Sequence, residues 1–207
     1  MPKSKITDPI IPFPEEINRN HFASWLSGFV DGEGHFGIRA GYIKNNCQYG
    51  CLETFFKITL RDDDSEIIEK IQSYFQCGLV RRRPFQGKIK VINKNDQITF
   101  SVNAISDLHN ILLPHFDNYP LQAKKAYDYI IWKQAVILLF SALGRKRQST
   151  RDKGFLPKYT KEERNYFHYL HKLMIEQRKY KQNKIKPNIK PLRETCIKPA
   201  QLLFDFS

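Results

Sequence analysis

The sequence has few cysteines and no hydrophobic run long enough to cross a membrane. Its four cysteines, at positions 47, 51, 77 and 196, form no CxxC pair, so a zinc site is not expected. The chain also starts without a signal-peptide pattern, which favours a reduced intracellular compartment over secretion. The longest apolar stretch, Ala135 to Leu143, is about half of the roughly 20 residues that a transmembrane helix needs. We therefore expect no membrane partner.

Acidic residues are also few relative to basic ones. Thirty-four Lys and Arg residues stand against 21 Asp and Glu residues, which gives a formal net charge of +13. This balance favours polyanionic partners such as nucleic acid, without choosing DNA over RNA. Ala and Gly are sparse while Ile, Lys, Asn, Phe and Tyr are plentiful, which hints at the A+T-rich genome of an organelle, chloroplast or mitochondrion. With 207 residues, one sizeable domain is expected.

Residues 20–34 carry the strongest structural signals in the chain. They predict a short helix that Asn18 or Asn20 can cap. The apolar positions recur at helical spacing and form one face, which we expect in the core: Phe22, Trp25, Leu26 and Phe29.

A stripe of small side chains lies on the opposite side of this predicted helix. Ser24, Gly28 and Gly32 recur at four-residue spacing, and Ser27 lies beside them. Glycine inside a helix costs about 0.5–1 kcal/mol relative to alanine, so two on one face imply a compensating packing role. A second helix could approach this stripe more closely than the usual separation of about 8–10 Å between helix axes.

Two acids end the predicted helix. Asp31 and Glu33 fall at its C-terminus, where the negative end of the helix dipole disfavours a carboxylate by a few tenths to about 1 kcal/mol. A divalent cation would reverse that sign, and hard cations such as Mg²⁺ take oxygen ligands and keep waters and phosphate oxygens in the remaining positions. The alternative is a helix end with two solvated acids.

Hairpins and helices follow in order. We expect strands at 35–40, 48–60, 79–85 and 98–102, and helices at 65–76, 103–114, 118–143 and 160–174. Capping boxes are expected at Asp63–Glu66 and Thr160–Glu163. Residues 1–19 contain four prolines and are expected to be irregular, and residues 182–207 form a basic, proline-containing tail. Residues 20–181 remain as the folded domain.

This order predicts an α+β fold with an antiparallel sheet that has helices on one face. The other face is open. A twisted antiparallel ribbon fits the DNA major groove, where arginine pairs with guanine and shorter polar groups reach other base edges. Any solvated strand also turns polar residues toward water, so the pattern alone does not distinguish a DNA-binding face from an ordinary solvated one. The open face mixes donors and acceptors: Arg39, Glu53, Lys57, Thr59, Arg81, Arg83, Lys88, Thr99 and Ser101.

A motif in the first predicted helix favours the DNA-binding interpretation of the open face. The stretch Leu26-Ser27-Gly28-Phe29-Val30-Asp31-Gly32-Glu33-Gly34 resembles the LAGLIDADG motif of homing endonucleases, with both glycines and both acids in order and a strand expected next. The resemblance implies the αββαββα fold of that family, in which two such helices pack face to face and the last acid of each binds catalytic metal. It implies that Glu33 is a catalytic metal ligand and that Gly32 contributes a backbone carbonyl.

The resemblance extends from about His21 to Leu143 and includes a second stretch, Tyr119-Pro120-Leu121-Gln122-Ala123-Lys124-Lys125, similar to the family's Tyr-Pro-Leu segment with a following lysine. It implies a catalytic lysine beside the active site, for which Lys124 and Lys125 are both candidates. One position departs from the family pattern: Leu60 stands where a polar residue of the water-organising shell is expected, and Arg61 is the candidate substitute.

The same resemblance implies a DNA-binding saddle made by the open sheet face and the adjoining turn. The residues then expected to contact double-stranded DNA are Gly37, Arg39, Lys44, Asn46, Gln48, Glu53, Lys57, Thr59, Arg61, Arg81, Arg83, Lys88, Lys90, Thr99 and Ser101.

The chain has a single copy of the motif, so its small-residue stripe implies a symmetric homodimer with Ser24, Ser27, Gly28 and Asp31 at the interface. The function that the resemblance implies is intron homing: Mg²⁺-dependent cleavage of both DNA strands at a long, nearly palindromic site, leaving 3′ overhangs. Mn²⁺ is expected to substitute for Mg²⁺, and Ca²⁺ to bind without supporting cleavage. The alternatives are a maturase that binds intron RNA and a non-cleaving DNA-binding protein.

Overall fold

The computed structural model describes residues 10–41, 52–83, 96–145, 149–150, 154–155 and 159–179. Four strands form an antiparallel sheet in the order β1-β2-β4-β3, and a second, two-stranded sheet pairs β5 with β6. The four-stranded sheet confirms both predicted hairpins. Its strands and those of the small sheet are β1 (Gly34–Ala40), β2 (Leu52–Arg61), β3 (Leu79–Arg83), β4 (Gln97–Val102), β5 (Ser149–Thr150) and β6 (Gly154–Phe155).

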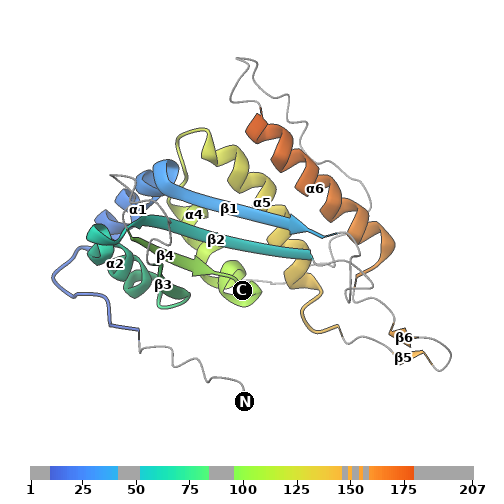
Figure 1. Cartoon of the computed structure of the whole chain (residues 1–207), viewed down its shortest axis with the longest axis horizontal. Coiled ribbons are helices and arrows are strands. Elements are labelled where there is room, and N and C mark those ends of the chain that lie inside the picture. The colour runs from blue at the N-terminus through green and yellow to red at the C-terminus, as the bar shows by residue number, and fades with distance from the viewer. Residues whose placement is uncertain are drawn as a thin grey trace, which may run out of the picture.

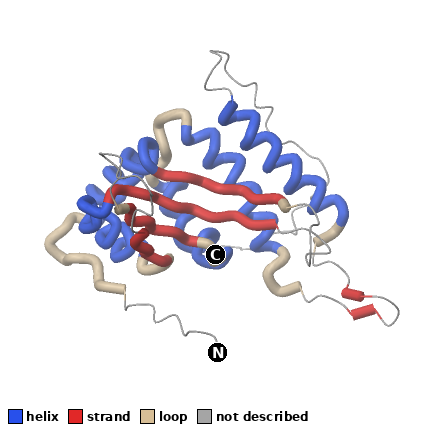
Figure 2. Tube along the Cα trace, viewed as in Figure 1, coloured by secondary structure: helices blue, strands red, loops and turns tan. Residues whose placement is uncertain are grey.

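The helices lie mainly on one side of this sheet. Figure 1 shows β1 and β2 in front of α4 and α5, and α6 alongside α5. Figure 2 shows the same division, with the strands in red on the near side. The helical segments are α1 (Arg19–Glu33), η1 (Asp62–Asp64), α2 (Ser65–Phe75), α3 (Ile105–Asp107), η2 (Leu108–Leu112), α4 (Leu113–Asn118), α5 (Lys125–Ser141) and α6 (Lys161–Lys179). The α+β class with helices covering one sheet face is as predicted.

The core is rich in aromatic side chains, which come from both layers. Phe36 of β1 packs against Phe56 of β2 at 5.2 Å and against Trp132 of α5 at 5.0 Å between ring centroids. Phe116 of α4 lies 5.7 Å from Phe56. All four side chains are buried, so each contributes about 1.5–3 kcal/mol or more of apolar burial that fastens α4 and α5 to the sheet. Among the helices of the described ranges, none is long and apolar enough to span a membrane.

Helix α1 begins as the sequence predicted but turns a different face inward. The Asn18 side chain caps it by accepting from the backbone N–H groups of Asn20 and His21. Its buried face consists of Ala23, Leu26, Ser27 and Val30. Trp25, which the apolar pattern placed in the core, is 45 % exposed, and the prediction for it is wrong.

Two other local predictions have opposite outcomes. Thr160 and Glu163 form the expected capping box at the start of α6, with reciprocal side chain to backbone bonds of 3.1 and 2.8 Å. The box at Asp63 is wrong, because residues 62–64 form a separate 3₁₀ turn and Asp63 instead pairs with Arg61 at 2.6 Å. The predicted helix 118–143 is shorter than expected, since residues 119–124 are not helical and α5 begins at Lys125.

Candidate functional site

The chain passes from α1 into β1 without a loop, and Gly34 permits this. A Cβ atom at position 34 would lie 2.5 Å from Cγ1 and 2.8 Å from the carbonyl oxygen of Val30, and a backbone atom cannot move away from such a contact. The Gly34 N–H also donates to the Val30 carbonyl and closes the last turn. Glu33 therefore stands at the tip of α1, next to the first strand of the sheet.

The two acids at this tip have different environments. Glu33 is exposed, and no hydrogen bond or ion pair links its carboxylate to another described residue. Asp31 points into its own chain: its Oδ2 accepts from the backbone N–H of Gln122 at 2.7 Å and of Ala123 at 3.1 Å. Its Oδ1 is buried without a partner. Asp31 was predicted at a dimer interface, but in the structure it fixes the segment that leads into α5.

Ser27 also binds this segment from inside the chain. Its Oγ donates to the Tyr119 carbonyl at 2.6 Å, and the Tyr119 hydroxyl donates to Asn20 Oδ1 at 2.9 Å. Ser27 is 4 % exposed, so its prediction as a dimer contact is corrected. Asn20, Ser27 and Asp31 together hold residues 119–123 along α1. We call these three residues the α1 clamp.

A buried histidine lies behind the clamp. His115 Nε2 is 3.4 Å from Ser27 Oγ, and His115 Nδ1 is 3.1 Å from the hydroxyl of Tyr74. Burial lowers the pKa of His115 to about 4, so the ring is neutral near pH 7. The ring thus links α1, α2 and α4 by hydrogen bonds without placing a charge in the core.

Lys125 is the lysine that the clamped segment brings to the motif. Its ammonium group donates to the Gly32 carbonyl at 3.1 Å and to the Gly34 carbonyl, so it binds the residues on both sides of Glu33. Lys124 is exposed and precedes the helix. The sequence offered both lysines as catalytic candidates, and of the two the structure brings only Lys125 into contact with the residues around Glu33.

The oxygen atoms at this tip fit a hard divalent cation. Glu33 offers a carboxylate that pairs with no other described residue, and Gly32 offers a carbonyl that already accepts one bond from Lys125 but keeps a second lone pair. Within the described part of the chain, no three His, Cys, Asp or Glu side chains are grouped as a metal site.

The small-residue stripe of α1 is open along its length. Ser24, Gly28 and Gly32 are exposed, and a Cβ atom at either glycine would meet nothing within 4 Å. Trp25 borders the stripe and stacks on Phe29 with 5.0 Å between ring centroids. A flat strip of helix backbone, edged by an exposed indole, thus leads to Glu33. Its use as a helix–helix contact stays a prediction.

The open sheet face carries the predicted polar residues, because the register brings them together. Arg39 faces Glu53 and pairs with it at 2.7 Å, Thr59 faces Thr99 at 3.0 Å, and Lys57 faces Ser101. Arg81 and Arg83 follow on β3 opposite Thr99 and Gln97. Arg61 also lies on this face, while Leu60 turns toward the core. Lys44, Asn46, Gln48, Lys88 and Lys90 lie outside the described residues.

Gly37 differs from its prediction, and three residues of this face were not among those expected to contact DNA. A Cβ atom at Gly37 would overlap the Phe55 ring, which covers it, so Gly37 has no open surface for DNA. Phe55, His35 and Gln97 lie on the open face by register. Strict alternation from Arg39 and Thr99 could have identified His35 and Gln97. Burial, followed by the nearby charges of Arg178, Lys57 and Lys125, lowers the pKa of His35 to about 4.

Comparison with known proteins agrees with this geometry. The family model described as "LAGLIDADG endonuclease" matches residues 26–136. The chain is 34 % identical over 119 residues to a probable intron-encoded endonuclease 2 of Neurospora crassa, which is 56 % of this chain and 24 % of that protein. It is 32 % identical over 123 residues to the uncharacterized mitochondrial protein RF1 of Saccharomyces cerevisiae, which is 58 % of this chain and 22 % of that one. The chain thus spans about a quarter of the length of these relatives.

Solved structures share the fold. The I-LtrWI LAGLIDADG homing endonuclease bound to target DNA superposes with a TM-score of 0.56 at 23 % identity, covering 76 % of this chain and 44 % of that one. The homing endonuclease I-TnaI gives a TM-score of 0.54 at 19 % identity, covering 76 % of this chain and 95 % of that one. The family model covers more than half of the sequence and includes both the motif, residues 26–34, and Lys125. The chain belongs to the LAGLIDADG endonuclease family.

Proposed function

We propose that this chain is a site-specific DNA endonuclease of intron homing. The observation that carries the proposal is the C-terminus of α1, where the exposed residue Glu33 lies in the chain between Gly32 and Gly34, whose carbonyls accept from the Lys125 ammonium. A carboxylate that no described residue pairs with is disfavoured at the negative end of a helix, and a metal ion shared with a phosphodiester would remove that penalty.

The open sheet face is the proposed DNA-binding surface. It begins at β1, directly after Glu33, so DNA bound there passes the tip of α1. The arginines Arg81 and Arg83 are exposed and can reach base edges or phosphates, while Thr59, Thr99 and Ser101 supply shorter donors and acceptors. The net charge of +13 supports binding to a polyanion, with an affinity that falls steeply with salt.

Two copies of the chain are proposed to meet at the open stripe of α1. The absence of side chains at Gly28 and Gly32 allows two helices to approach closely, and a twofold axis through this contact would bring two Glu33 tips together. Each tip would then act on one strand. That arrangement supports a nearly palindromic target and a cut of both strands, and the 3′ overhangs are proposed from the family resemblance alone.

Different residues of this chain would bind the metal ion and stabilise the phosphate. When bound, Mg²⁺ supplies Lewis-acid stabilisation of the scissile phosphate and lowers the pKa of a water molecule. Glu33 and the Gly32 carbonyl would hold it. Lys125 would stabilise the negative charge that develops on the phosphate, and the hydrogen bonds of the α1 clamp to residues 119–123 support this position of Lys125. Mn²⁺ is expected to replace Mg²⁺, and Ca²⁺ to support binding alone.

Cleavage of a library of intron-free insertion sites by the purified chain tests the proposal. We expect Mg²⁺-dependent double-strand cuts, and the sequenced ends should carry 3′ overhangs. Glu33→Gln should abolish cutting and leave DNA binding in Ca²⁺ within about threefold, while Glu66→Gln, which changes an exposed acid on α2, should leave both unchanged. Normal cutting by the Glu33→Gln variant would refute the assignment. We further propose an organelle, a mitochondrion or chloroplast, as the compartment.

A further inference from the structure

The open sheet face holds a large hydrophobic ring among its polar groups. Phe55 pairs with Gly37 in the β1–β2 register, so it points to the same side as Arg39, Glu53 and Lys57. Its side chain is only half-buried. This phenyl ring gives the otherwise largely polar face an apolar group that a ligand can contact.

The ring is held at a fixed place. It lies across Gly37, where a Cβ atom would overlap its Cζ, Cε1 and Cε2 atoms, and His35 stacks beside it at 5.7 Å and 21°. Position 37 therefore requires glycine because Phe55 occupies the space of a side chain. Gly37 provides the seat for the ring and has no contact surface of its own.

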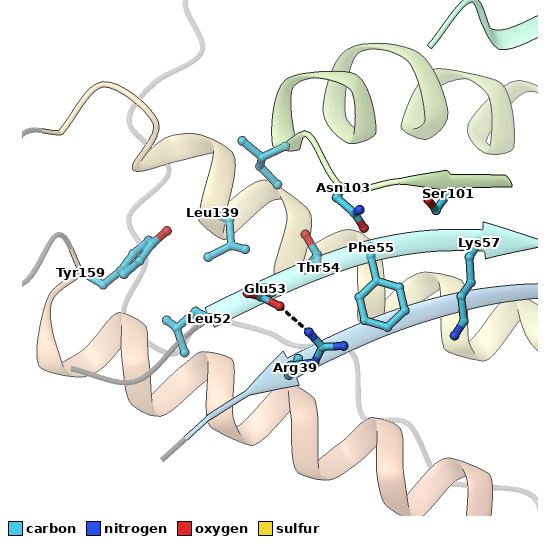
Figure 3. A pocket seen from close by; sticks show the side chains of 11 residues that line it. Arg39, Leu52, Glu53, Thr54, Phe55, Lys57, Ser101, Asn103, Leu139 and Tyr159 are labelled. Carbon is cyan, nitrogen blue, oxygen red and sulfur yellow. Dashed lines mark hydrogen bonds and ion pairs between the residues drawn. The ribbon is translucent and has the colours of Figure 1, made fainter. Parts of the chain in front are cut away.

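Cations flank the ring, and open space lies beside it. The Arg39 guanidinium is 5.4 Å and the Lys57 ammonium 5.6 Å from the ring centroid. Figure 3 shows Phe55 projecting between Arg39 and Lys57. The ring borders an open cavity of about 570 Å³ that Ser101 and Asn103 also line. Part of the ring thus remains accessible, with a positive charge on either side.

We propose that Phe55 gives this protein a preference for thymine at one base pair in each half of its DNA target, through contact with the 5-methyl group. The inference rests on the proposed binding of DNA to this face. In the major groove the thymine methyl is the apolar group that distinguishes one base pair from another. The flanking cations can meet phosphates or guanine while the ring covers the methyl group.

The size of the effect follows from the burial of one methyl group. Burial of one methyl group adds about 0.8 kcal/mol to the binding free energy, so DNA with thymine at that position should bind about fourfold more tightly than DNA with uracil. 5-Methylcytosine carries the same methyl group in the same groove. It should therefore bind more tightly than cytosine by a similar factor.

A binding selection with a randomised duplex library in Ca²⁺ tests the proposal, because Ca²⁺ separates binding from cleavage. The wild type should select thymine at one position of each half-site, and replacing that base with uracil in a synthetic duplex should weaken binding about fourfold. Phe55→Ala should bind the two duplexes equally. Gly37→Ala displaces the Phe55 ring from its position over residue 37 and should also reduce the discrimination between thymine and uracil. It replaces Phe55→Ala as the test variant if Phe55→Ala does not fold. Tyr169→Ala removes an exposed aromatic ring on α6 and should keep the discrimination.

Two results would overturn the inference. One is a wild type that binds thymine and uracil equally at every position of the selected site. The other is a Phe55→Ala variant that keeps the wild-type discrimination. Binding without cleavage in Mg²⁺ would refute the proposed nuclease function and leave this inference standing, whereas a wild type that selects no DNA sequence would remove both.

Discussion

Substitution of Gly28 by alanine should move two measurable properties in opposite directions. In one copy of the chain the added methyl group meets nothing within 4 Å and lies on an exposed helix surface. Alanine favours a helix over glycine by about 0.5–1 kcal/mol, so the isolated chain should become more stable. For a chain of this length that gain corresponds to a rise of about 1–4 °C in the midpoint of thermal unfolding.

Self-association should weaken in the same variant. In a symmetric dimer through the open stripe, each copy adds a methyl group where two helix backbones meet. Overpacking costs about 1–3 kcal/mol at each of the two equivalent sites, so the dimer dissociation constant should rise about 30-fold or more. DNA cleavage should fall with it, since a single Glu33 tip lacks its counterpart.

Sedimentation velocity, thermal unfolding at a concentration where the protein is monomeric, and plasmid cleavage measure the three quantities. Asn165→Ala is a matched control, because it improves helix propensity at an exposed position of α6, away from the stripe. It should stabilise the chain without changing association. If Gly28→Ala associates and cuts as the wild type does, the stripe is not the contact and the dimer must be built on another surface.

Two further predictions concern a lysine and a histidine. Lys125→Met should lower the cleavage rate by about 10²-fold or more while DNA affinity changes little. Lys124→Met should cut normally, because of the two lysines only Lys125 contacts the carbonyls beside Glu33. Equally slow single-turnover cleavage by the two variants in Mg²⁺ would contradict this prediction. His115 has a pKa of about 4 in the folded state against 6.5 when unfolded, so the unfolded state binds more protons below pH 6.5. The stability that the neutral His115 ring contributes is therefore lost on acidification, by up to about 1.4 kcal/mol per pH unit between pH 6.5 and pH 4. Urea unfolding at pH 7, 6 and 5 should give a shallower slope for His115→Gln, and an unchanged slope would show that this ring does not titrate as described.

The sequence was sufficient for the local and periodic features of the fold. Alternation of apolar residues identified the strands, and the Thr160–Glu163 box forms as predicted because its partners are three residues apart. The position of Glu33 at a helix end also follows from local signals. These features depend on neighbours in the chain, which a single sequence displays directly.

Predictions failed where a side chain has a partner far away in the sequence. Ser27 and Asp31 bind backbone groups of Tyr119 and Gln122, more than 90 residues later, so their inward orientation leaves no local trace. The choice of Lys125 over Lys124 depends on where α5 begins, which those same contacts determine. Gly37 was predicted to contact DNA from its place on the strand, yet its role is set by Phe55 on the neighbouring strand.

The most direct test of the account is the position of bound metal in a complex with target DNA. Crystals grown with Mn²⁺ and a duplex that carries the insertion site give anomalous peaks that locate the ions. We expect peaks at the Glu33 carboxylates of two adjacent copies of the chain, next to the phosphates of the two cut positions. Manganese bound elsewhere, or two α1 tips held apart on the DNA with no ion at Glu33, would contradict the account.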